Sequence, residues 1–274
     1  MQILLNELTL HGQFADKNEF VNIAVTPFIR ILKEMRVFEA VLFKKSDVWE
    51  KMVTPTDNLH SILTSKGHPD EVRRFKSAMA NLLGDPFWDN DSKQDPGCIY
   101  YLDGNNISGS SPAEACERDN VIVSFKPSNS SSTPLNIDRS EVIVPLLNLT
   151  SPGELREYLW SKKKITFQKY VQARFSVGKL DFSNVEKRLG FDLVQQSDQQ
   201  SLFIDTFAKF EKLAWEEIYK DKGLCYKEYS NDFFGKKKTQ KFRASQKLRC
   251  HGYRDNESFV VMGFEVDHKL SDDG

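Results

Sequence analysis

The stretch KFRASQKLRCHGYRDNESFVVMGFEVD, residues 241–267, carries the clearest strand signal in this chain of 274 residues. Three segments read as strands, KFRAS, KLRCHGYR and SFVVMGFEVD, and the polar run at 254–257 separates the last two as a turn. Upstream, from Ser201 to Gly223, apolar residues recur at helical spacing; these are Phe203, Phe207, Phe210, Ala214 and Ile218. This order predicts a small C-terminal domain, residues 201–274, in which a helix packs on an antiparallel sheet.

The rest of the chain predicts a mixed α/β domain, so the fold class expected for the whole is α+β. Apolar runs predict buried strands at 3–10, 39–45, 120–125 and 140–149. The polar stretch PSNSSSTP, residues 127–134, reads either as a long surface loop or as a domain boundary. As a boundary it gives an N-terminal domain at 1–135 and a connecting α/β region at 136–200, before the C-terminal domain.

Two helices outside the C-terminal domain have clear start signals. Asp16 can cap a helix that runs to about Arg36, and Pro27 is expected to kink or split it. The segment SPGEL, residues 151–155, supplies Ser at the cap, Pro at the first helical position and Glu at the third. It predicts a capping box and a helix through about Ser161.

Composition narrows the class of protein. An apolar content of 39% with 20 Phe is enough for a substantial core, and no apolar run reaches the ~18–20 residues that span a bilayer. The start of the chain lacks the basic flank of a signal peptide. The four Cys residues form no CxxC pair, which argues against a zinc site or a disulfide framework. We therefore expect a cytoplasmic protein that neither enters a membrane nor needs a cofactor.

Positive charge is concentrated near the C-terminus although the net charge is only −1. Residues 235–254 hold eight Lys or Arg and no Asp or Glu. Such a stretch attracts polyanions, which predicts RNA or another nucleic acid as the partner. The residues expected to bind it are Lys236, Lys237, Lys238, Lys241, Lys247, His251, Tyr253 and Arg254.

Alternation along a strand sharpens this prediction. Arg249, His251 and Tyr253 are spaced i, i+2 and i+4, so a strand would present all three on one side. A guanidinium, an imidazole and an aromatic ring suit a single-stranded RNA base and its phosphate. The alternative is a solvated, salt-bridged strand face without a ligand.

The order of one long helix, a basic turn and three strands resembles the RelE/ParE toxin superfamily. The similarity lies in two basic strands, a tight turn, an apolar strand and a terminal segment with His and Lys, and it is confined to the C-terminal part of the chain. Members that cleave ribosome-bound mRNA do so without a metal ion. The resemblance implies Arg243, Arg249, His268 and Lys269 as catalytic residues, with an antitoxin as protein partner. Residues 1–200 have no counterpart in that superfamily.

Two other interpretations stay open. Asp267 and His268 at the end of the last strand resemble the opening of an HNH nuclease motif, but its downstream Asn and His would lie beyond Gly274. The acids of this region could also bind a divalent ion weakly; they are Glu265, Asp267, Asp272 and Asp273.

The alternative function is a non-catalytic subunit of a larger bacterial defence assembly. Its basic sheet would dock on nucleic acid or on an acidic protein partner. The segments LTLHGQF and DPFWDND resemble uncharacterised bacterial proteins of defence loci. The chain shows no complete catalytic motif, which favours this alternative over an endoribonuclease.

Overall fold

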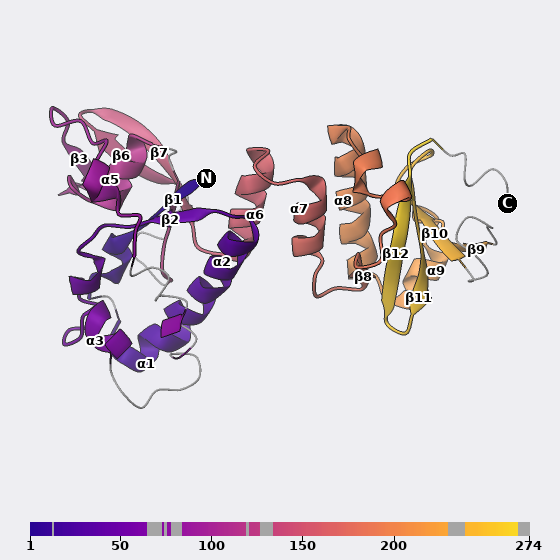
Figure 1. Ribbon diagram of the computed structural model, residues 1–274, viewed down its shortest axis with the longest axis horizontal. Coiled ribbons are helices and arrows are strands. Elements are labelled where there is room, and N and C mark those ends of the chain that lie inside the picture. Colours follow the sequence, from indigo (N-terminus) through magenta and orange to yellow (C-terminus); the bar gives the residue numbers. More distant parts are fainter. Residues whose placement is uncertain are drawn as a thin grey trace. The chain divides into compact units, whose positions relative to one another are not determined.

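The computed structural model divides into two compact units, residues 1–164 and 165–274 (Figure 1). Both combine helices with a β-sheet, so the expected α+β class is confirmed. No helix in the described part of the chain is long and apolar enough to cross a bilayer. The residues that the structure describes are 1–12, 14–64, 73, 76–77, 84–118, 121–126, 134–229 and 239–267.

The N-terminal unit is built on a mixed sheet with the strand order β2-β1-β5-β7-β6-β3-β4. The first four strands in this order are parallel, and β6, β3 and β4 continue the sheet antiparallel. Because β6 and β7 join this sheet, the chain does not divide near residue 135 as expected. The strands are β1 (Gln2–Leu5), β2 (Val41–Phe43), β3 (Tyr100–Leu102), β4 (Asn105–Asn106), β5 (Val121–Val123), β6 (Leu135–Arg139) and β7 (Val142–Leu149).

The helix expected from Asp16 forms as one run of three parts. These are α1 (Lys17–Glu19), a π-helical turn at Phe20–Val25 and α2 (Thr26–Val37). Pro27 lies in the first turn of α2, and because it has no N–H to donate, the preceding residues close wider turns instead of breaking the helix.

Among the described residues, three more α-helices of this unit have defined bounds, and one of them confirms a sequence prediction. They are α3 (Leu59–Thr64), α5 (Ser111–Cys116) and α6 (Pro152–Ser161). The α6 helix begins with the predicted capping box. The Glu154 amide donates to Ser151 Oγ at 3.2 Å, and the Ser151 amide donates to Glu154 Oε2 at 3.0 Å.

Polar side chains are buried where the parallel strands end. Asn6 follows β1 and donates from Nδ2 to Ser124 Oγ at 2.9 Å, and Ser124 donates in turn to Asn148 Oδ1. All three residues are almost completely buried. Beside them Glu7 accepts a hydrogen bond on Oε1 from the Ser111 amide at 2.8 Å. This network links β1, β5 and β7, and it satisfies groups that would otherwise be costly to bury.

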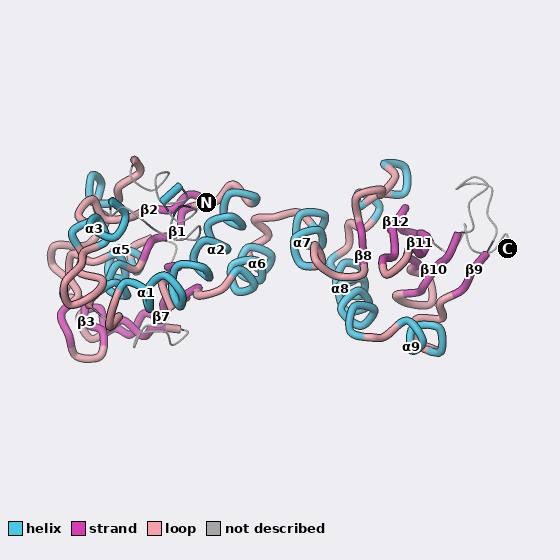
Figure 2. The backbone as a smooth tube through the Cα atoms, turned by 90° about the horizontal axis from the view of Figure 1, so that it is seen from below, coloured by secondary structure: helices cyan, strands magenta, loops and turns pink. Residues whose placement is uncertain are grey.

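The C-terminal unit is a second sheet with the order β8-β12-β11-β10-β9 (Figure 2). Strands β9 to β12 pair antiparallel, and β8 adds at the edge in parallel with β12. The three strands predicted from the quoted stretch are confirmed. The elements are α7 (Phe167–Arg174), β8 (Leu180–Asp181), α8 (Ser197–Lys212), α9 (Trp215–Lys220), β9 (Lys227–Tyr229), β10 (Thr239–Arg243), β11 (Arg249–Asp255) and β12 (Ser258–Glu265).

Phenylalanine rings join α8 to one face of this sheet, as the sequence predicts. Phe210 stacks on Phe242 of β10 with centroids 4.6 Å apart, and Phe203 meets Phe264 of β12 at 5.2 Å. The expected single helix to Gly223 is wrong, however. It is interrupted at Leu213, whose backbone is extended, and α9 starts afresh with Glu217 accepting from the Ala214 amide at 2.7 Å.

A bulge interrupts the pairing of β11 with β12. His251 pairs with Gly263 and Gly252 with Val261, so the register skips Met262. The carbonyl of Met262 instead accepts a hydrogen bond from the Glu186 amide at 2.8 Å. Gly252 is required opposite the bulge, because a Cβ there would collide with the Val260 carbonyl oxygen and the Phe259 ring.

Candidate nucleic-acid interface

One face of the C-terminal sheet carries the basic residues, and the other packs on α8. Cys250 pairs with Phe242 and with Phe264, both of which lie in the aromatic core. Strand alternation therefore turns Arg249 and His251 away from α8. We call this second side the outer face. Cross-strand pairing assigns to it Lys227, Tyr229, Lys241, Arg243, Arg249, His251, Tyr253 and Glu265.

Like charges stand directly opposite one another on the outer face. Lys241 of β10 pairs with Lys227 of β9, and Arg243 pairs with Arg249 of β11. Like charges in such positions destabilise an antiparallel sheet. Arg249 also stands directly opposite Glu265 of β12, so one carboxylate lies among these four cations. The arrangement leaves an excess of positive charge on this face, which attracts an anion.

A chain of three polar side chains lies at the centre of the outer face. His251 is 0% exposed, its Nε2 lies 3.1 Å from Glu265 Oε2, and its Nδ1 is hydrogen-bonded to the Tyr229 hydroxyl. Burial lowers the pKa of His251 below its ordinary value, although the hydrogen bond to Glu265 acts in the opposite direction. The neutral ring then donates from Nε2 to the carboxylate and accepts from Tyr229 at Nδ1.

Lys241 places a cation beside this chain. Its Nζ lies 4.5 Å from the centroid of the Tyr229 ring, over the ring face. Burial, and next the charge of Glu265, raise the pKa of the Tyr229 hydroxyl. The hydroxyl is therefore protonated at neutral pH and faces a neutral imidazole.

The two arginines predicted to be catalytic use their N–H groups within the chain. Arg249 donates from Nη2 to the Gln246 carbonyl at 2.8 Å and from Nη1 to the Leu248 carbonyl at 3.0 Å, which closes the turn between β10 and β11. Arg243 donates to the Gly223 and Lys222 carbonyls, both at 2.9 Å. Both contribute charge to the outer face, but these donors hold loops rather than point at a ligand.

The structure also revises the predicted binding residues. His251 is interior, so the expectation that its ring lies open to a nucleotide beside Arg249 and Tyr253 does not fit the geometry. Arg254 belongs to the opposite face, where its guanidinium lies 4.1 Å from the centroid of the Trp215 ring. Arg254 directly follows Tyr253 in β11, and neighbouring residues of a strand point to opposite faces of the sheet.

Besides Lys241, which lies on the outer face, two predicted residues keep places compatible with binding. Lys247 is exposed in the turn before β11, and Tyr253 is half-buried on the outer face. The other predicted residues lie outside those that the structure describes; they are Lys236, Lys237, Lys238, His268 and Lys269. The HNH interpretation and two of the proposed cation ligands, Asp272 and Asp273, depend on the same undescribed segment.

Sequence reasoning missed Tyr229 and gave Glu265 a different role, as a weak cation ligand. The alternation of Lys227, Glu228 and Tyr229 is the local signal of an edge strand, but three residues are too few to identify it. Glu265 lies 14 positions from His251, and only the register of β11 with β12 brings them together.

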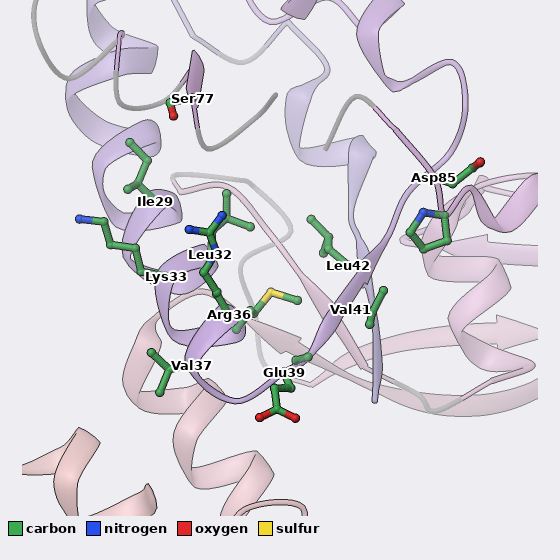
Figure 3. Close-up of a pocket in the computed structure, with 13 residues that line it drawn as sticks. Ile29, Leu32, Lys33, Arg36, Val37, Glu39, Val41, Leu42, Ser77 and Asp85 are labelled. Carbon is green, nitrogen blue, oxygen red and sulfur yellow. The ribbon is translucent and has the colours of Figure 1, made fainter. Parts of the chain in front are cut away.

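The N-terminal unit contains a groove of about 840 Å³ between α2 and β2 (Figure 3). Its walls are mostly apolar, with Ile29 and Leu32 on the helix and Leu42 on the strand. Lys33 and Glu39 put charges of both signs on its lining. The groove therefore shows no preference for an anion, in contrast to the outer face.

No protein-family model, curated protein or solved structure matches this chain. The resemblance to RelE/ParE toxins and the fainter one to defence-locus proteins therefore stay predictions, and function has to be inferred from the site itself.

Proposed function

We propose that the protein binds single-stranded RNA through the outer face of its C-terminal unit, in the cytoplasm. The observation that carries the proposal is the direct opposition of Lys241 to Lys227 and of Arg243 to Arg249. These four residues gather positive charge on one face, and a phosphate backbone that contacts them would release its counterions.

Aromatic rings on the same face support a single strand over a duplex. Tyr229 and Tyr253 both lie there and are half-buried rather than enclosed. Unpaired bases stack on such rings, whereas bases in a duplex are already stacked on each other. The lysine over the Tyr229 ring would bring a phosphate contact next to a stacked base.

The proposal concerns binding, and it gives Arg243 and Arg249 an electrostatic role. Their N–H groups hold backbone carbonyls, which supports charge attraction over the bidentate phosphate clamp that cleavage by these residues would need. The alternative to RNA is an acidic protein partner, either an antitoxin or another subunit of a defence assembly. Such a partner would bind the same Lys and Arg residues of the outer face.

Fluorescence anisotropy with a labelled single-stranded RNA tests the proposal. The variant Lys227→Gln/Lys241→Gln removes one like-charge pair and also the cation over the Tyr229 ring. These two effects have opposite signs, so its stability should stay close to that of the parent protein. Its affinity should fall, and the slope of log K against log salt should become shallower by about 1.4, or about 0.7 for each lost phosphate contact. Thermal unfolding of the same samples separates lost binding from lost fold.

A matched control is Lys212→Gln/Lys220→Gln, which removes the same charge from exposed lysines of α8 and α9. It should bind RNA as the parent protein does. Equal losses in both double variants would show unspecific attraction and would overturn the proposal. A parent protein without measurable affinity at low salt would overturn it too, and would leave the acidic protein partner.

A further inference from the structure

The three groups at the centre of the outer face have the relative positions of a nucleophile, a base and an orienting carboxylate. The Tyr229 hydroxyl meets His251 Nδ1, and His251 Nε2 meets Glu265 Oε2 at 3.1 Å. Catalytic triads are recognised by this arrangement of roles and not by chain order. The His251 and Glu265 side chains are both 0% exposed, which protects the hydrogen bond between them from competing water.

The direction of the hydrogen bonds fixes where a proton can go. Since the carboxylate of Glu265 accepts from Nε2–H, the lone pair of His251 lies at Nδ1 and faces the Tyr229 hydroxyl. If the tyrosine loses its proton to Nδ1, Glu265 stabilises the imidazolium that forms. Of the three residues Tyr229 is the most accessible, being half-buried, so the reacting oxygen belongs to the residue that reaches toward the surface.

We propose that the Tyr229 hydroxyl is a nucleophile that attacks a phosphodiester of single-stranded nucleic acid held on the outer face. The inference rests on the proposed binding function and adds a reaction to it. The phenolic oxygen forms a bond to phosphorus, and the bond from phosphorus to one ester oxygen of the sugar breaks. The phenol proton passes to His251 Nδ1 and then to the departing oxygen, so the products are a phosphotyrosyl ester and a free sugar hydroxyl.

Such a reaction also needs a cation near the phosphoryl oxygens, and the lysines of the outer face can supply it. Negative charge grows on the phosphoryl oxygens as the phenolic oxygen attacks, and a nearby cation stabilises it. Lys241, with its ammonium over the Tyr229 ring, is positioned for this, and Lys227 is its cross-strand neighbour. Because the protein provides the nucleophile, the 2′-hydroxyl of RNA is not needed, and DNA is a substrate for the same chemistry.

The test uses labelled single-stranded DNA and RNA oligonucleotides in which one bridging ester oxygen is replaced by sulfur. One set carries sulfur on the 5′ side of the scissile phosphate and one set on the 3′ side. The thiol that leaves does not reverse the reaction efficiently, so the covalent product accumulates. The full-length protein is incubated with each oligonucleotide and separated under denaturing conditions, and the adduct is mapped to a peptide by mass spectrometry.

We expect a covalent band with one of the two DNA sets and a phosphotyrosyl group mapped to Tyr229. The variant Tyr229→Phe should give no adduct. The control Tyr219→Phe, whose hydroxyl lies near Arg254 and away from the outer face, should react as the parent protein does. Glu265→Gln tests the positioning residue, and it should slow adduct formation at least 10-fold while the adduct still maps to Tyr229.

The other outcomes separate the two proposals. RNA binding without an adduct on any oligonucleotide overturns the nucleophile and leaves the binding function in place. An adduct that persists in Tyr229→Phe, or that maps to another residue, overturns the assignment to Tyr229. Cleavage of RNA alone, ending in a 2′,3′-cyclic phosphate, also overturns it because the attacking group is then the RNA hydroxyl. A protein that binds no RNA at all overturns the binding function first.

Discussion

Both units bury hydrogen-bonded polar side chains beside a sheet, but the groups differ in what they can do. In the N-terminal unit Asn6, Ser124 and Asn148 link three parallel strands through amide and hydroxyl groups that do not titrate near neutral pH. In the C-terminal unit Tyr229, His251 and Glu265 can exchange a proton along their chain. Burial of polar groups is therefore not enough to mark a reactive site.

The two networks also differ in the charges that surround them. The outer face adds lysines and arginines in opposed pairs around its buried chain. The N-terminal network adds Glu7, whose Oε2 has no hydrogen-bond partner among the described residues. An excess of one charge around a titratable group favours the approach of a ligand of the opposite charge.

The largest expected effects come from matched core truncations, one in each unit. Phe207→Ala removes a fully buried ring that contacts Phe203, Phe242 and Phe264, and Phe28→Ala removes a ring stacked on Phe125 at 4.0 Å. Each should lower the free energy of unfolding by about 3–5 kcal/mol. Hydrogen exchange of peptides from each unit, combined with RNA binding in rising urea, measures the consequences.

RNA binding should fail at lower urea in Phe207→Ala and persist further in Phe28→Ala, because the outer face belongs to the unit that Phe207 supports. Equal loss of binding in both variants would show that the two units unfold together. It would contradict the expectation that each unit can be destabilised separately.

The pH dependence of the C-terminal unit should be set in part by His251. Burial lowers its folded-state pKa below the ordinary 6.5, so the unfolded chain binds the proton more readily. Stability is therefore complete above about pH 6.5 and is lost as the pH falls toward the folded-state pKa. Urea unfolding between pH 5 and pH 8 should show this loss, and His251→Gln should flatten it. An unchanged slope in the variant would contradict the buried neutral ring.

Glu7 should give the N-terminal unit the opposite dependence. Burial raises its folded-state pKa above the ordinary 4.5, although the Ser111 hydrogen bonds act against the rise. The folded unit then binds the proton more readily, so stability is greatest below about pH 4.5 and declines as the pH rises toward the folded-state pKa. Glu7→Gln should remove the decline in hydrogen exchange of this unit. A parallel decline in that variant would assign it to another group.

The smallest effect is expected for Arg254→Gln. The change removes a cation over the Trp215 ring at 4.1 Å and should lower the midpoint of thermal unfolding only slightly. RNA affinity should stay near that of the parent protein, because Arg254 lies on the face of α9. A loss as large as that of the Lys227/Lys241 variant would show that the outer face is not the binding surface.

Local signals in the sequence were sufficient for several elements. The capping box at Ser151 and Glu154 fixed the start of α6, since both partners lie within one turn. The Phe stripe of α8 and the three C-terminal strands followed from periodicity. Such features depend on neighbours in the chain, which a sequence displays directly.

Features that depend on distant partners were not predictable. The pairing of β7 with β5 crosses the polar stretch 127–134, and nothing local shows on which side of a boundary β7 belongs. The same holds for the candidate site. Basic composition drew attention to β10 and β11, but the contact of Tyr229 with His251 depends on two strand registers. Alternation showed on which side of β11 the His251 side chain lies. It did not show that other side chains cover that ring completely.

The bulge at Met262 has a consequence for how the chain tolerates changes in length. Phe259 and Phe264 both face α8 although they are an odd number of positions apart, which regular alternation forbids. Deleting Met262 would restore regular alternation and leave both rings inside and Glu265 beside His251. A lost codon in the middle of a strand normally exchanges its two faces; here it would leave them unchanged, and the loss would be confined to the anchor that the Met262 carbonyl gives to Glu186.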